Sequence, residues 1–122
     1  MQFHYLSAND LNSVISACLT RQSHYITQPS GEIERSPASS HVAYQQAYQD
    51  VLNTLNALPD QAVVELQALA WAGRGDNGGN LAETLDTSRM RFDGTTRGYL
   101  YRMPLHTYLN AGLARTGVAL RP

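Results

Sequence analysis

Apolar residues recur along this chain mostly at every third or fourth position, which is the spacing of one buried face of a helix. The most regular stretch follows Pro59, a residue that suits the first turn of a helix. Its apolar and small residues share one helical stripe: Val63, Leu66, Leu69, Ala70 and Gly73. Glu65 and Gln67 fall outside this stripe, so we expect them to point away from the core. The stretch predicts a core-facing helix that ends at Gly73 and Gly75, because glycine closes helices easily.

The same spacing predicts further helices on both sides of this stretch. Serine or asparagine, which cap helix N-termini well, precedes three of them: Ser7, Ser39 or Ser40, and Asn80. Shorter helices are predicted over residues 96–102 and 104–117. No stretch alternates in the manner of a strand, and we expect residues 118–122 to be loose. The chain is therefore predicted to be an all-α single domain, residues 1–122, of about five helices, two long and three shorter.

Residues 26–40 interrupt the helical pattern. The segment contains Pro29, Pro37, Gly31 and several serines, which cannot sustain a helix interior. A connection of this length without a pattern of its own is usually either functional or mobile. We therefore expect a long polar linker after the first helix, and its simplest interpretation is a flexible connection.

Length, charge and cysteine content narrow the functional classes. At 122 residues the chain fits one domain, and its formal net charge is −1. Nonspecific nucleic-acid binding requires a basic face, so this charge argues against nucleic acid as a partner. No run approaches the roughly 20 apolar residues of a membrane span, so we expect no membrane partner. Cys18 is the only cysteine, which excludes an intramolecular disulfide and is typical of a cytoplasmic protein.

The sequence contains no recognisable catalytic or metal-binding set. Metalloprotease, nucleophile-elbow and phosphate-loop motifs are missing. Gly73, Gly75 and Gly78 match the spacing of a dinucleotide-binding loop, but that loop must follow a strand, and here a helix precedes it. The four histidines are scattered: His4, His24, His41 and His106. We therefore predict no catalytic residue, metal or cofactor, although an enzyme assembled from distant residues stays open.

One corner of the chain combines the residue types that recognition sites use. Trp71, Arg74 and Asp76 lie at a glycine-rich turn, and tryptophan and arginine dominate binding hot spots. We expect three residues of a later helix to pack beside this corner: Tyr99, Tyr101 and Arg102. The plainer alternative is structural: Trp71 belongs to the core, and Arg74 and Asp76 tie two helix ends together.

Three functional hypotheses follow from this corner. The first is an interaction or adaptor module whose partner is another protein or a second copy of the chain. The second is a small-ligand binder or enzyme in which Arg74 grips an anionic group that Asp76 orients. It requires a concave pocket with perturbed titratable groups. The third, with the least support from the modest net charge, is an inhibitor protein from a mobile element that binds its target through an acidic face.

Three phrases of the sequence together resemble a known family. They are Leu6-Ser7 to Leu11, Ala70 to Asp76, and Tyr99 to Leu109. Over nearly its whole length the chain resembles the family of small bacterial proteins known as domain of unknown function 3775. Trp71–Asp76 and Met103–Leu105 are the most specific parts, whereas Asn77-Gly78-Gly79 departs from a shorter loop in the family pattern. The resemblance implies a helical, bacterial, cytoplasmic protein and supplies no activity.

Overall fold

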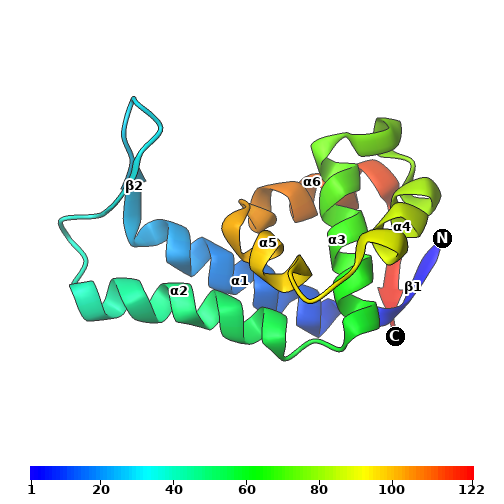
Figure 1. Ribbon diagram of the computed structural model, residues 1–122, viewed down its shortest axis with the longest axis horizontal. Coiled ribbons are helices and arrows are strands. Elements are labelled where there is room, and N and C mark those ends of the chain that lie inside the picture. The colour runs from blue at the N-terminus through cyan, green and yellow to red at the C-terminus, as the bar shows by residue number, and fades with distance from the viewer.

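Six α-helices, one short 3₁₀ helix and four short strands make up the computed structural model, which describes residues 1–122 (Figure 1). In chain order they are β1 (Gln2–Ser7), α1 (Ala8–Ser23), β2 (Tyr25–Thr27), β3 (Ile33–Arg35), α2 (His41–Asn56), α3 (Asp60–Arg74), η1 (Asp76–Gly79), α4 (Leu81–Arg91), α5 (Thr96–Arg102), α6 (Leu105–Thr116) and β4 (Ala119–Arg121). The mostly helical architecture confirms the all-α prediction, with one α-helix more than the five expected. None of the helices combines the length and apolar character that crossing a membrane requires.

The two longest helices, α1 and α2, run antiparallel and side by side (Figure 1). Ser7 caps α1, because its Oγ accepts a hydrogen bond from the Asp10 amide at 3.1 Å. Ser40 caps α2 in the same way through the Ala43 amide, also at 3.1 Å. Buried apolar residues of both helices join one hydrophobic core: Leu11, Val14, Cys18, Val51 and Leu55.

Helix α3 is buried along almost its whole length, because α6, α4 and β1 all contact it. From Ala62 to Gly73 every residue except Val64 is buried. The expectation that Glu65 and Gln67 point away from the core is therefore wrong, since their exposed fractions are 3% and 2%. A central helix has no solvent face to which polar residues can turn, so each of these side chains needs a partner or a cavity within the fold.

Glu65 finds its partners in strand β1. Its carboxylate accepts three backbone hydrogen bonds of 2.7–2.9 Å, donated by the amides of His4, Tyr5 and Leu6. These three successive amides lie between Gln2 and Ser7, where the register of β1 against β4 is irregular. The carboxylate thus gives them acceptors and holds the N-terminal segment against α3.

The strands were not predicted, and two expectations change with them. β1 and β4 pair in parallel, with Gln2 opposite Ala119. The expectation that residues 118–122 are loose is therefore wrong. Val118 is 8% exposed and belongs to the hydrophobic core, which anchors this segment to the helices. This pairing joins the two ends of the sequence, and such a non-local contact leaves little trace in a short stretch of residues.

As predicted, residues 26–40 form no helix, but two short paired strands fall largely within them. β2 and β3 pair as an antiparallel hairpin, with Ile26 opposite Glu34, and Gly31 takes a positive φ of 90° at its turn. The hairpin stands beyond the ends of α1 and α2 and away from the rest of the molecule (Figure 1). Its flexibility stays a prediction.

Candidate functional site

The glycine turn after α3 brings Arg74 and Asp76 together. α3 continues through Gly73 and ends at Arg74, and Gly75 closes it with a left-handed φ of 100°. The reversal of the chain at Gly75 lets the Asp76 carboxylate reach back to Arg74 and accept two hydrogen bonds. Nε donates to Oδ1 at 3.0 Å, and Nη2 donates to Oδ2 at 2.7 Å. The result is a two-pronged ion pair of fixed geometry.

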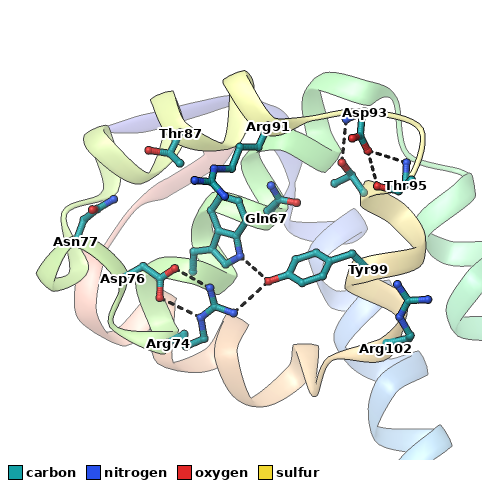
Figure 2. A pocket seen from close by; sticks show the side chains of 12 residues that line it. Gln67, Arg74, Asp76, Asn77, Thr87, Arg91, Asp93, Thr95, Tyr99 and Arg102 are labelled. Carbon is teal, nitrogen blue, oxygen red and sulfur yellow. Dashed lines mark hydrogen bonds and ion pairs between the residues drawn. The ribbon is translucent and has the colours of Figure 1, made fainter.

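The phenol of Tyr99 links this ion pair to Trp71. Its oxygen accepts hydrogen bonds from Trp71 Nε1 at 3.0 Å and from Arg74 Nη1 at 3.1 Å (Figure 2). The Trp71 and Tyr99 rings meet edge to face, with centroids 6.4 Å apart. Trp71 is only 9% exposed, so it forms part of the wall of the site and does not protrude as a contact residue. The four side chains form one connected network across α3, the turn and α5.

Hydrogen bonds also set the protonation of both aspartates at this site. The guanidinium of Arg74 lowers the pKa of Asp76, and the same pairing raises the pKa of Arg74. Asp93 lies before α5, where the hydroxyl and the amide of Thr95 both donate to its Oδ1, at 2.6 and 2.8 Å. These donors lower the pKa of Asp93. Both carboxylates are therefore ionised at neutral pH.

The network lies along an open cleft of about 840 Å³ bordered by α3, α4, α5 and the glycine turn (Figure 2). Twelve residues line it: Gln67, Trp71, Arg74, Asp76, Asn77, Thr87, Arg91, Asp93, Thr95, Thr96, Tyr99 and Arg102. Five of the six residues named from the sequence are in this set. Gln67 of α3 is buried, and the cleft that it lines gives its side chain an opening.

Tyr101 does not join the cleft, although we expected it there. Successive helical residues are about 100° apart, so Tyr101 leaves α5 on nearly the opposite side from Tyr99. It packs against Tyr48 with ring centroids 6.2 Å apart, and the guanidinium carbon of Arg21 lies 5.5 Å from its ring centroid. Tyr101 thus packs on the side of α5 that faces Tyr48 of α2 and Arg21 of α1.

Two arginines of the cleft have no acidic partner. Arg74 is paired with Asp76, and Asp93 is held by Thr95, whereas Arg91 and Arg102 make no ion pair. Figure 2 shows the side chains of Arg91 and Arg102 well apart, with the Tyr99 ring between them. With three arginines against two aspartates, the lining carries one excess positive charge.

Arg102 was predicted from the sequence and Arg91 was not, although one feature of α4 points to Arg91. Thr87 and Arg91 are four residues apart, so they share one face of α4, while Leu81, Leu85 and Ser88 face the core. This polar face, on the helix that directly follows the glycine turn, indicates that Thr87 and Arg91 could line a site at the turn. The direction of that face, toward α5, depends on tertiary packing and could not be read locally.

Two arginines outside the cleft fix the position of α5, which forms one of its walls. Arg97 donates to the Leu55 and Leu58 carbonyls at 3.1 and 2.6 Å and pairs with Asp60 at 3.0 Å. Arg21 donates to the Tyr101 and Met103 carbonyls at 2.6 and 3.3 Å. These bonds tie α5 to the end of α2 and to α1. They thereby fix the position of this wall of the cleft.

The chain belongs to the family described as "Protein of unknown function (DUF3775)", whose model matches residues 48–118. All twelve residues that line the cleft fall within this matched region, whereas the hairpin β2–β3 lies outside it. No curated protein and no solved structure gives a significant match to the chain. No three His, Cys, Asp or Glu side chains lie together as a metal site would require. The family description names no activity, so the function is inferred from the cleft of this chain.

Proposed function

We propose that this protein is an interaction module whose cleft binds an acidic segment of a protein partner. The observation that carries the proposal is the pair of arginines, Arg91 and Arg102, which lie apart along the open cleft without an acidic partner. A guanidinium can donate two parallel hydrogen bonds to one carboxylate. Two such groups spaced along a cleft suit an extended ligand with carboxylates at intervals.

The other named residues have a different role in this proposal. Arg74 already has its charge compensated by Asp76, and Tyr99 accepts a bond from both Arg74 and Trp71. We assign these four residues to the shape and rigidity of the cleft, which lowers the entropic cost of binding. Arg91 and Arg102 are the residues that contact the ligand.

The state of the carboxylates supports binding over catalysis. A general acid or base works best when its pKa lies near the working pH, and an aspartate reaches that range only if its pKa is raised. The pKa of Asp76 and that of Asp93 are lowered instead, and both side chains are occupied by hydrogen-bond donors.

The proposal includes a cytoplasmic setting, which the single buried thiol of Cys18 supports.

The proposal is tested with labelled decapeptides that contain glutamates at spacings of two to six residues. Fluorescence anisotropy compares wild type with the Arg91→Ala/Arg102→Ala double variant. Arg89→Ala is the matched control, since Arg89 lies on the same helix α4, outside the cleft, and pairs with Asp86. We expect the double variant to bind the best peptide at least about tenfold more weakly, while the control binds as wild type does. Equal binding by all three proteins contradicts the proposal.

A small anionic molecule is the second candidate ligand, and the size of the cleft favours it. Small-molecule sites span roughly 300–1,000 Å³, and the cleft measures about 840 Å³. A small-ligand site was expected to be a concave pocket with perturbed titratable groups, and this cleft is concave and contains two aspartates whose pKa is lowered. Thermal unfolding in the presence of citrate or inorganic pyrophosphate tests it. A rise in Tm that is lost in Arg91→Ala/Arg102→Ala supports a small ligand, and no rise for either compound rejects these two.

A further inference from the structure

The hairpin carries two carboxylates that complement the two arginines of the cleft. Glu32 and Glu34 are two residues apart in extended chain, so they share one face at a spacing of roughly 7 Å. Glu32 makes no side-chain contact with a donor, and Glu34 accepts only the amide of Gln28, at 2.8 Å. No arginine pairs with either glutamate. The hairpin also carries Arg35, which donates to the Ser39 carbonyl at 2.8 Å, so the hairpin has a net charge of −1 while the cleft lining carries one excess positive charge.

The hairpin is also placed to contact another molecule. It projects beyond one end of the α1–α2 pair, whereas α4, which carries Arg91, lies at the other end of the molecule (Figure 1). Ile26 and Ile33 on the hairpin are 42% and 55% exposed. A two-stranded hairpin is marginally stable alone, so a partner that covers these side chains would stabilise it. The hairpin of a chain does not reach the cleft of that chain.

We propose that the hairpin β2–β3 of one copy docks into the Arg91–Arg102 cleft of a second copy. This inference rests on the proposed function, in which the cleft takes an acidic segment, and it names a partner that supplies one. Glu32 and Glu34 of the first copy meet Arg91 and Arg102 of the second. The contact uses different surfaces on the two copies, so it is head-to-tail and builds a ring or an open chain.

Charge reversal at both surfaces gives a specific test, because all four residues are exposed and replaceable without disturbing the core. Glu32→Arg/Glu34→Arg makes hairpin and cleft both positive. Arg91→Glu/Arg102→Glu makes both negative. Each variant alone then repels its own copies, whereas a mixture pairs the positive hairpin with the negative cleft and the negative hairpin with the positive cleft. Sedimentation velocity measures the association, and circular dichroism verifies that each variant is folded.

We expect wild type to associate with rising concentration at low salt, and to associate less at high salt because exposed charges are screened. Each reversed variant should associate at least about tenfold more weakly than wild type, and the equimolar mixture should regain association. A wild type that stays monomeric at millimolar concentration overturns the proposal. So does association that is equal in wild type and both variants, since the interface then lies elsewhere.

The failure of this inference is distinguishable from the failure of the proposed function. The variant Glu32→Arg/Glu34→Arg keeps Arg91 and Arg102, so the acidic decapeptides should still bind its cleft. Peptide binding without self-association means that the cleft works but the hairpin is not its ligand. If instead the peptides bind wild type, Arg91→Ala/Arg102→Ala and Arg89→Ala equally well, the proposed function itself is rejected.

Discussion

Gly73 on α3 faces Gly112 on α6 so closely that neither residue has room for a β-carbon. A β-carbon on Gly73 would lie 1.9 Å from the Tyr108 carbonyl oxygen and 2.6 Å from the Gly112 nitrogen. A β-carbon on Gly112 would lie 2.3 Å from the Leu69 carbonyl oxygen. All these neighbours are backbone atoms, which cannot rotate away as a side chain can. The two helices therefore cross at backbone contact.

Gly112→Ala should destabilise the fold, because α6 must move away from α3 to admit the methyl group. We expect the free energy of unfolding to fall by about 1–3 kcal/mol, the usual cost of overpacking. Urea unfolding followed by circular dichroism measures it. Gly98→Ala is the control, since Gly98 lies within α5 and a β-carbon there meets nothing within 4 Å. Equal stability of the two variants would show that the crossing tolerates a wider separation.

Glu65→Gln should weaken the attachment of β1 to α3. The amide of glutamine is neutral and keeps only one acceptor oxygen for the three amides of His4, Tyr5 and Leu6. We expect a loss of about 2 kcal/mol in the free energy of unfolding, as for hydrogen bonds to a charged group. Hydrogen exchange should accelerate first at the amides of residues 4–6. The exposed Glu83→Gln is the control, and uniform acceleration over all helices would argue against a local role for Glu65.

His106 should make stability depend on pH. Burial and the nearby charge of Arg21 lower the pKa of His106, so the unfolded chain binds a proton more readily than the folded one. The stability from neutral His106 is complete above the unfolded pKa, about 6.5, and is lost as pH falls below it. We expect urea midpoints to drop between pH 7.5 and 5.5 in wild type, with a smaller drop in His106→Gln. The exposed His41→Gln should behave as wild type; identical drops in all three would exclude His106 as the source.

Arg74→Ala should raise the pKa of Asp76 toward its ordinary value, because the guanidinium is the first cause of its lowering. The carboxylate contributes stability above the unfolded pKa of about 3.9, and the contribution is lost as pH falls through the lower, folded pKa. Both side chains are about one-third exposed, so solvent screening limits the effect to below about 1 kcal/mol. NMR titration of the carboxyl carbon gives the pKa directly. Arg89→Ala, outside the cleft, should leave it unchanged, and an unchanged value in Arg74→Ala would contradict the pairing.

Local signals predicted much of the helical architecture. Ser7, Ser40 and Asn80 cap the helices that they were expected to cap, and each side chain accepts a backbone amide three residues on. Gly75 closes α3 with the left-handed conformation that glycine favours. These are interactions within a few residues, so the sequence pattern contains both partners.

Most of the missed features depend on residues far apart in sequence. The burial of Glu65 requires amides about sixty positions away, and the β1–β4 pair joins the two ends of the sequence. At the site, the Arg74–Asp76 pair was predictable because only Gly75 separates the two residues. Arg91 and Asp93 enter the cleft only because α4 packs against α3 and the chain then returns to α5 on the other side of the cleft. Tyr101 is different, since the helical period alone places it about 200° around α5 from Tyr99.

The parallel pairing of β1 with β4 has a practical consequence for engineering. The carbonyl of Met1 accepts a hydrogen bond from the Ala119 amide at 3.2 Å, so a glycine-rich linker that runs back along the short strand β4 can join Pro122 to Met1. New ends can be opened at Gly31, where even an added β-carbon would meet nothing within 4 Å. Such a circular permutant keeps every residue of the cleft in one uninterrupted segment while it cuts the hairpin in two. It would separate ligand binding from head-to-tail assembly by connectivity alone, without the change of a single cleft residue.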